Sequence, residues 1–236
     1  MKLVILAGGY GTRISEETKL KPKPSIRIGK KPIIWHIMKI YSFFGIKDFI
    51  ICLGYKGYIL KRELAKYRKI ENWNIEFVNT GLDTMTGGRV KRIKKYIKKD
   101  KNFCLTYGDG LCNVNIKKLI NFHIKKNKIA TITAVQQKNR YGVLFIDKTS
   151  KIKLIKEKPN EYINGGFFVL STKIFKFLKN DRTIFEKDCL PILSKKKQLL
   201  AFKHKGFWAC MDTVRDKNEL NKIWKSKSKA WQVWIN

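Results

Sequence analysis

The sequence predicts an α/β protein with a doubly wound, mostly parallel sheet and a small antiparallel part. Three observations support this. Short apolar runs typical of buried strands alternate with segments of ten or more residues whose apolar positions follow a helical period. The first apolar run leads directly into a glycine-rich loop. A strand-rich stretch interrupts the alternation in the second half, where an added antiparallel part is therefore expected.

The amino-terminal half is expected to alternate between strands and helices. The apolar run 2–6 predicts the first strand. Pro32 is favoured at a helix start and Gly45 just after a helix end, so the apolar face between them predicts a helix. The elements expected after it are the buried strand 49–53, the helix 57–67, the short strand 75–78, and a helix with Val90, Ile93 and Ile97 on one face.

The carboxyl-terminal half continues the pattern. A strand at 103–106 ends in Tyr-Gly-Asp-Gly, and the run 130–135 predicts another strand after a helix marked by Ile116, Leu119, Ile120 and Ile124. The runs 143–146, 152–155 and 167–170 form the strand-rich stretch. Thr213 to Asp216 resembles a capping box that opens a last helix, with Leu220, Ile223 and Trp224 directed inward. Since no repeat or linker interrupts the chain, residues 1–236 are expected to form a single domain.

The formal net charge is +34, because Lys and Arg number 52 and Asp and Glu number 18. A nucleic-acid or anionic-membrane binder would show such a charge, and so would an ordinary surface rich in lysine. The lysines are spread over almost every segment, and no aromatic-basic module accompanies them. We therefore favour the second explanation and expect no specific nucleic-acid partner, although small phosphorylated substrates would be attracted.

Other features limit the class of protein. No apolar run reaches transmembrane length, so we expect no membrane partner. The five cysteines show no Cys-x-x-Cys spacing and the three histidines are far apart in sequence, which makes a zinc site improbable. We therefore expect the cysteines to be reduced thiols and the protein to be cytoplasmic.

The glycine loop Leu-Ala-Gly-Gly-Tyr-Gly-Thr-Arg, residues 6–13, follows the first strand. Such a loop exposes backbone N–H groups to a phosphate at the carboxyl edge of a sheet. It does not complete a dinucleotide-binding fingerprint, because Ile14 stands at the third glycine, and no Gly-Lys-Ser/Thr of a P-loop follows. Two prolines hold Lys23 in the extended Lys-Pro-Lys-Pro segment. Arg13 and Lys23 are therefore expected as two cations beside one strand end.

The stretches LAGGYGTRISEET and KPKPS resemble the signature of sugar-1-phosphate nucleotidyltransferases. The resemblance extends through TYGDG, EKP and MDTVRDK, while SEETK, TMTGGR and INGGFFV are similar to the glucose-1-phosphate cytidylyltransferase branch. It implies a Rossmann-like, GT-A-like fold and a reaction in which CTP and glucose 1-phosphate give CDP-glucose and pyrophosphate. A place in nucleotide-sugar and O-antigen type surface polysaccharide synthesis would follow. Two alternatives remain: a thymidylyl- or uridylyltransferase for this or another sugar 1-phosphate, and a non-catalytic sugar-nucleotide or nucleic-acid binder.

The resemblance also implies roles for individual residues. The catalytic cations would be Arg13 and Lys23, and Asp109 and Asp212 would bind Mg²⁺. The sugar phosphate would be held by Glu157, Lys158 and Asn164. The implied nucleotide-binding residues are Leu6, Ala7, Gly8, Gly9, Gly11, Thr12, Thr84, Gly88, Arg89 and Gly108. Glycines 87 and 88 are expected to leave room for the base.

Two departures from the family pattern stand out. The segment 57–79 is shorter than is usual in cytidylyltransferases, in which it is expected to contribute to subunit contacts. A homo-oligomer is expected, but the shortened segment leaves the form of its assembly open. Cys210 stands where a proline commonly precedes Met-Asp-Thr. Three tryptophans, at 208, 231 and 234, are candidates for sugar platforms, although packing roles are favoured.

Overall fold

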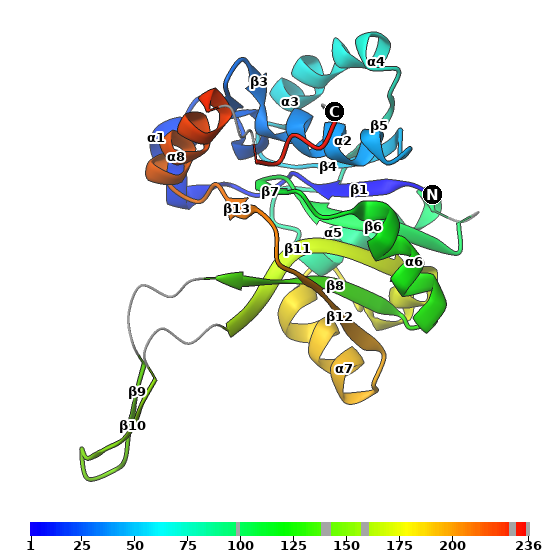
Figure 1. Ribbon diagram of the computed structural model, residues 1–236. Coiled ribbons are helices and arrows are strands. Elements are labelled where there is room, and N and C mark those ends of the chain that lie inside the picture. Colours follow the sequence, from blue (N-terminus) through cyan, green and yellow to red (C-terminus); the bar gives the residue numbers. More distant parts are fainter. Residues whose placement is uncertain (98–99, 138–142, 157–160, 227–229, 235–236) are drawn as a thin grey trace.

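A seven-stranded sheet runs through the middle of the molecule (Figure 1). The computed structural model describes residues 1–97, 100–137, 143–156, 161–226 and 230–234. The strands of the sheet, in spatial order, are β12 (Leu199–His204), β8 (Ala130–Gln137), β11 (Glu161–Ser171), β6 (Asn102–Tyr107), β1 (Leu3–Leu6), β4 (Asp48–Leu53) and β5 (Asn74–Asn79).

The sheet is mostly parallel, as the sequence predicts. Strand β1 pairs in parallel with β4 and β6, β4 with β5, and β12 with β8. Strand β11 is antiparallel to both of its neighbours, β6 and β8. The run 167–170 was expected in the added antiparallel part, but it lies inside the main sheet. Its side chains, from Phe167 to Leu170, are buried on both faces of that sheet, which explains their unbroken apolar character.

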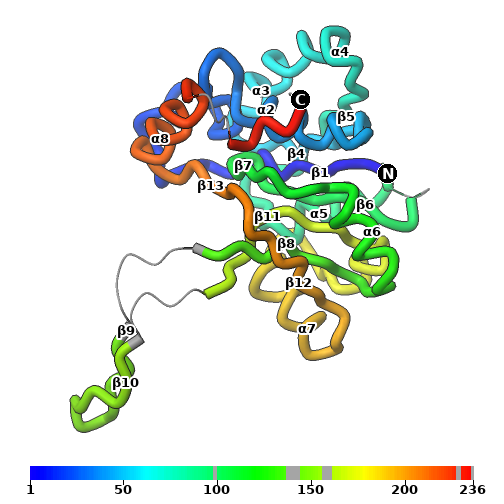
Figure 2. Tube along the Cα trace, viewed as in Figure 1, coloured from blue at the N-terminus to red at the C-terminus, as the bar shows by residue number. Residues whose placement is uncertain are grey.

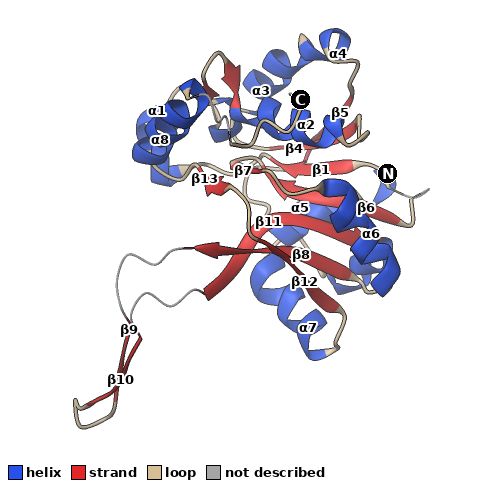
Figure 3. Cartoon of the chain, in the orientation of Figure 1, coloured by secondary structure: helices blue, strands red, loops and turns tan. Residues whose placement is uncertain are grey.

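Helices cover both faces of the sheet (Figure 3). Leu3 and Ile5 of β1 enter one apolar core, while Val4 and Leu6 enter the other, as strand alternation requires. The first core contains residues of α2 (Ile33–Phe43), α3 (Gly57–Ala65), α4 (Tyr67–Ile70), α6 (Ile116–Lys126) and α8 (Val214–Lys225). The second contains residues of α5 (Thr86–Arg92) and α7 (Leu190–Lys195). The fold is therefore doubly wound.

Most helix boundaries follow the local signals. Gly45, with φ +86°, comes just after the end of α2. The helix expected at 57–67 is divided into α3 and α4, and the one carrying Val90 ends at Arg92 before a 3₁₀ turn at Lys94–Tyr96. The capping box at Thr213 is confirmed, since its side chain accepts from the Asp216 N–H and the Asp216 carboxylate accepts in return. The sequence analysis missed α7 and β12, which are short and separated by a run of lysines.

Three small two-stranded sheets complete the fold. Strands β2 (Arg27–Ile28) and β3 (Lys31–Pro32) form one of them, and β7 (Gly110–Cys112) with β13 (Trp208–Cys210) another. The third is the hairpin of β9 (Val143–Ile146) and β10 (Ile152–Lys156), which projects from the body of the molecule (Figures 1 and 2). It accounts for two of the three strands expected in the antiparallel part.

The chain returns to its beginning at the carboxyl-terminal end. Helix α8 lies beside α1 (Ser15–Thr18), where the red and blue parts of the trace meet in Figure 2. The Lys217 ammonium forms an ion pair with Glu17, and this hydrogen bond lowers the pKa of Glu17. The start of α8 is thereby tied to the segment that follows the glycine loop.

All five cysteines are free thiols, and Cys210 alone among them is only half-buried. In the part of the chain that is described, no helix combines the length and the apolar character needed to span a membrane.

Candidate active site

A cavity of about 1150 Å³ opens at the carboxyl ends of β1 and β6. This is the edge at which doubly wound sheets bind their ligands. The cavity brings together most of the residues that the sequence analysis singled out, although they are spread over more than 200 positions. Those that line it are Leu6, Ala7, Gly8, Gly9, Gly11, Thr12, Arg13, Lys23, Thr84, Arg89, Gly108, Asp109, Asn164 and Asp212.

Glu157 and Lys158, the two other sugar-phosphate candidates, lie outside the described residues. Gly88 is described but is not among the residues that line the cavity. A Cβ at Gly88 would lie 2.5 Å from the Asp181 carbonyl oxygen, and one at Gly87 would lie 2.8 Å from that of Thr183. The space expected for a base at these glycines is filled by the backbone of 181–183. The glycines allow α5 to approach that segment closely.

The glycine loop is held in a single backbone conformation. Gly11 has φ +68°, in the left-handed region that favours glycine. The Thr18 hydroxyl donates to the Gly11 carbonyl at 3.1 Å, and the N–H of Ile14 donates to the same oxygen at 3.1 Å. These bonds direct the loop into the 3₁₀ turn at Thr12–Ile14 and place Arg13 at the cavity.

Arg89 lies below the loop as a buried cation, with only 5% of its surface exposed. Its guanidinium donates to the carbonyl oxygens of Gly8, Leu53, Gly81 and Leu82 and to the Thr80 hydroxyl, at 2.7 to 3.3 Å. These acceptors lie at the carboxyl ends of three strands: in the loops that follow β1 and β5, and at the last residue of β4. Burial lowers the pKa of Arg89, and the neighbouring Arg92 lowers it further. Arg89 therefore joins these three strand ends and adds positive charge beneath the glycine loop.

Lys23 lies between two carboxylates. Its Nζ atom is 2.6 Å from Asp109 Oδ2 and 2.7 Å from Asp212 Oδ1. Arg13 Nη1 contacts the other Asp212 oxygen, Oδ2, at 2.6 Å. Burial lowers the pKa of Lys23, but the two carboxylates outweigh this effect and raise it overall. Lys23 is thus held as an ammonium ion, in a side chain only 12% exposed.

The pairing of β7 with β13 explains why the two aspartates meet. Asp109 directly precedes β7, and Asp212 lies two residues after β13. Residue 110 pairs with Cys210 in the antiparallel ladder, and the Met211 N–H donates to the Asp109 carbonyl at 3.0 Å. Asp216 accepts from the Asp212 N–H at 3.0 Å, which fixes the backbone at the start of α8.

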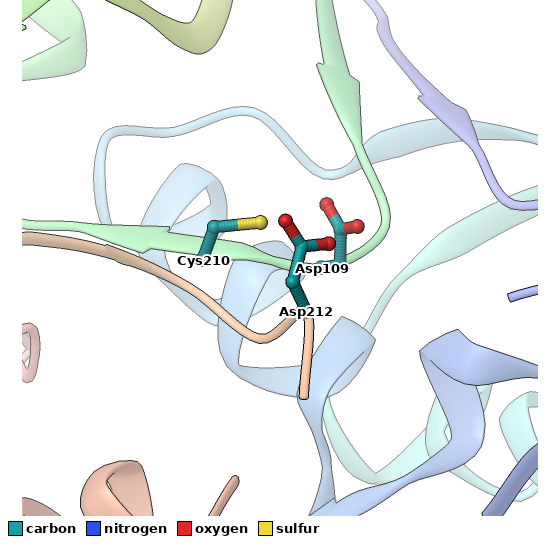
Figure 4. Close-up of side chains that lie close together, drawn as sticks. All are labelled: Asp109, Cys210 and Asp212. Atoms are coloured by element: carbon teal, nitrogen blue, oxygen red, sulfur yellow. The ribbon is translucent and has the colours of Figure 1, made fainter. Parts of the chain in front are cut away.

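The donor set at this point fits a divalent cation. One ligand atom from each of Asp109, Cys210 and Asp212 lies within 4.8 Å of the others (Figure 4). Two carboxylates from separate segments are the hard oxygen ligands that Mg²⁺ prefers. The Cys210 thiol points at the same carboxylates in Figure 4. Burial and then these two anions raise the pKa of Cys210, so it is held as the protonated thiol.

The far wall of the cavity comes from β11. The Asn164 side-chain oxygen accepts from the Gly166 N–H at 2.9 Å, at the point where the pairing of β11 with β8 shifts register. Trp208 lines the cavity and donates from its indole to the Gly165 carbonyl at 2.7 Å. Trp231 is fully buried in the first core. Of these two tryptophans, only Trp208 stays a candidate for a sugar platform.

A further group of polar residues lines the cavity beside β11, and no pattern in the sequence marked it as part of the site. The Tyr107 hydroxyl and the Thr86 hydroxyl both donate to the carboxylate of Glu186, the latter at 2.8 Å. Glu186 comes from a π-helical turn at Phe185–Cys189, so no helical or strand period in the sequence marks it. Burial and then Glu186 raise the pKa of Tyr107. All three residues line the cavity and add one carboxylate and two hydroxyl groups to its polar lining.

The chain is similar to known proteins over nearly its whole length. The model of the family described as Nucleotidyl transferase matches residues 2–225. A curated glucose-1-phosphate cytidylyltransferase of Salmonella typhimurium is 46% identical over 257 aligned residues, which cover 99% of this chain and 100% of the relative. The crystal structure of HddC from Yersinia pseudotuberculosis superposes with a TM-score of 0.76 at 30% identity, covering 95% of this chain and 99% of that one. A structure of HddC complexed with GMP-PN gives a TM-score of 0.75 at 29% identity and the same coverage.

Proposed function

Because this chain belongs to the nucleotidyl transferase family, we infer that it is an enzyme that makes CDP-glucose and pyrophosphate from CTP and α-D-glucose 1-phosphate. The observation that carries this inference is the 46% identity to a glucose-1-phosphate cytidylyltransferase over the whole of both chains. The cavity supports it, since it combines a glycine loop, two cations and a carboxylate pair at the edge of the sheet.

The chemistry suits a site without a nucleophile–base pair. A phosphate oxygen of glucose 1-phosphate attacks the α-phosphorus of CTP, and the bond from that phosphorus to the β-phosphate oxygen breaks. The nucleophile is already an anion near neutral pH, so no general base is needed. Catalysis then depends on alignment and on neutralising charge.

The cations have distinct positions for this task. Arg13 is 74% exposed at its side chain and lies at the mouth of the cavity, where it can contact the outer phosphates. Lys23 lies deeper, next to the carboxylates, where it can contact the transferred phosphate. The N–H groups of the glycine loop, supported from below by Arg89, would bind further phosphate oxygens.

We propose Asp109 and Asp212 as the residues that hold Mg²⁺ when the substrates are bound. The ion would neutralise charge on the reacting phosphates and polarise the α-phosphorus. Asp212 can keep its contact with Arg13 through Oδ2 while Oδ1 serves the metal. Arg13 would then stay bound to Asp212 while both carboxylates bind the metal.

We assign the sugar side to Asn164 and the neighbouring wall of β11, with Glu157 and Lys158 as further contacts. Thr84 is proposed as a contact of the base, because it is nearly buried at 8% exposure and still lines the cavity. A hydroxyl can donate to the cytosine O2 or N3 or accept from its N4 amino group. Thr84 can therefore form a hydrogen bond with any of these three groups of cytosine.

We also propose that the protein is a homo-oligomer. The β9–β10 hairpin exposes about half of several large apolar side chains, and its pairing register directs them to both of its faces. They are Leu144, Ile146, Ile152, Leu154 and Ile155. A two-stranded hairpin is marginal in water without packing on a face. Exposed apolar side chains gathered on one element in this way are typical of surfaces that pack against another subunit.

One assay tests the reaction. Pyrophosphate release would be measured with CTP, UTP, dTTP, ATP and GTP, each against glucose 1-phosphate and a panel of other sugar 1-phosphates. CTP with glucose 1-phosphate is expected to give the highest kcat/KM, with CDP-glucose as the product by mass spectrometry. Turnover with UTP or dTTP but not CTP would exclude the cytidylyl assignment, and no turnover with any pair would favour a binding protein.

A further inference from the structure

The position of the Lys23 ammonium coincides with the position that a divalent cation needs. We propose that Lys23 is an internal counter-ion that competes with the metal for Asp109 and Asp212. Metal entry and the movement of Lys23 toward the triphosphate are then one coupled event. This inference rests on the proposed metal site and goes beyond it, because it concerns what occupies the carboxylates before the metal does.

The distances leave no room for both cations. Lys23 Nζ lies 2.6 Å from Asp109 Oδ2 and 2.7 Å from Asp212 Oδ1, and the other Asp212 oxygen is held by Arg13. A metal bound to both aspartates at these oxygens, at about 2.1 Å for Mg²⁺, would lie next to the ammonium. It would also meet the full positive charge of the ammonium at short range, since the Lys23 side chain is mostly shielded from water. Binding of the metal therefore requires Lys23 to leave.

The structure allows this movement without a change of backbone. The turn that carries Lys23 is fixed by hydrogen bonds from the N–H of Ser25 to the Pro22 carbonyl at 2.8 Å and from that of Ile26 to the Lys23 carbonyl at 3.0 Å. Only the flexible four-carbon stem has to rotate. The stem starts beside the glycine loop, because a Cβ at Gly11 would lie 3.2 Å from Lys23 Cβ. Rotation about the stem takes the ammonium into the cavity in front of that loop.

The consequence is a thermodynamic coupling between metal and nucleotide. Without an anion in the cavity, release of Lys23 leaves an unpaired, partly buried cation, so the metal alone binds weakly. A triphosphate at the loop gives Lys23 a new partner and frees the carboxylates. By linkage, each ligand strengthens the binding of the other by the same factor, which is typically 5- to 150-fold. Lys23 thus keeps the carboxylates paired until both ligands are present.

The test is binding of Mn²⁺ to the full-length protein without nucleotide, measured from the loss of the free Mn²⁺ signal in electron paramagnetic resonance. The variant is Lys23→Met, which keeps the length of the stem and removes the charge. The matched control is Lys21→Met, which changes the net charge equally in the same segment. Lys21 forms an ion pair with Glu17 at 3.4 Å and, among the described residues, is not a partner of Asp109 or Asp212. Lys23→Met is expected to bind Mn²⁺ about 10-fold more tightly than wild type or more, and Lys21→Met like wild type.

The outcomes separate the inference from the proposed function. Equal Mn²⁺ affinity in wild type and Lys23→Met, with binding lost in Asp109→Asn, would overturn the competition and leave the metal site intact. Mn²⁺ binding that does not depend on Asp109 would overturn both. If Lys23→Met is poorly folded, Lys23→Gln replaces it, and the rise in Tm on adding Mn²⁺ is compared between variants. A larger rise than in wild type supports the competition, and an equal rise contradicts it.

Discussion

The guanidinium of Arg89 occupies the space in which a side chain at position 8 would lie. A Cβ added to Gly8 would stand 2.1 Å from Arg89 Nη1 and 2.6 Å from its Cζ, while Arg89 Nη2 donates to the Gly8 carbonyl at 3.1 Å. Gly8, which the sequence indicates as a nucleotide-binding residue, is thus needed for a second reason: any side chain at this position would collide with Arg89. The loop and its support are a single packed unit.

Gly8→Ala is expected to lower Tm and to raise KM for CTP, because the new methyl group would displace Arg89 from the three strand ends that it joins. Gly9→Ala is the matched control for Tm, since a Cβ at Gly9 meets nothing within 4 Å. Thermal unfolding of both variants, with KM as the second measurement, checks this. A Tm for Gly8→Ala equal to that of Gly9→Ala would mean that Arg89 moves aside at no cost.

Arg89→Lys is expected to lower the free energy of unfolding by about 2 kcal/mol, because an ammonium cannot reach all the acceptors and leaves buried carbonyl groups unpaired. Arg92→Lys provides the control. Arg92 forms a two-bond contact with the exposed carboxylate of Asp181, at 2.9 and 2.7 Å, and surface pairs of this kind contribute little to stability. Urea unfolding measures both variants, and equal losses would contradict the structural role of Arg89.

Asp109→Asn and Asp212→Asn are each expected to lower turnover by about 10² or more, since each removes an anionic metal ligand while keeping its shape. The measurement is kcat as a function of Mg²⁺ concentration. Asp181→Asn, at the exposed pair with Arg92, should retain near-normal turnover. Normal turnover of either site variant at saturating Mg²⁺ would remove that residue from the metal site.

His36 is expected to make the protein less stable in acid. The pKa of His36 is lowered to about 4, chiefly by burial and to a smaller extent by Lys31, while a hydrogen bond to the Ile28 carbonyl opposes these effects. Its Nε2 bonds that carbonyl at 3.0 Å and its Nδ1 accepts from the Trp231 indole at 3.4 Å, as a neutral ring can. The unfolded chain protonates His36 near pH 6.5, so the stability that the neutral ring contributes is present above that pH and is lost as the pH falls toward 4.

The check is a comparison with His36→Gln. The wild type should exceed the variant in unfolding free energy at pH 7, and the difference should shrink by about 3 kcal/mol at pH 4. His123 and His204, whose pKa values burial also lowers, affect both proteins alike and cancel. A difference that does not change with pH would show that His36 is not held neutral.

Ile155→Lys in the β9–β10 hairpin is expected to shift the protein to a smaller assembly, because a charge would enter the proposed interface. Ile124→Lys makes the same change on α6, where the side chain is 54% exposed against 59% for Ile155. It should leave the assembly unchanged. Size-exclusion chromatography with light scattering measures the mass. A monomeric wild type would contradict the proposed homo-oligomer.

The sequence by itself determined the features that depend on local pattern. The strand–helix alternation, the glycine loop with its two cations and the capping box at Thr213 could all be recognised because helical period, turn chemistry and capping act over a few residues. The family resemblance then supplied roles that local physics could not. Of the 17 residues assigned to the site in this way, the structure brings together all but Gly88 and the two outside the described residues.

Only the tertiary structure decided which groups meet. Asp109 and Asp212 are 103 positions apart and become neighbours through the pairing of β7 with β13, two short strands with no signal of their own. The burial of Arg89, the entry of β11 into the main sheet and the contact of Glu186 with Tyr107 likewise depend on segments distant in sequence. The position of Lys23 between the carboxylates is the clearest case. Pattern identifies it as a cation near a phosphate, but only long-range packing shows that its partners are the two anions a metal would need.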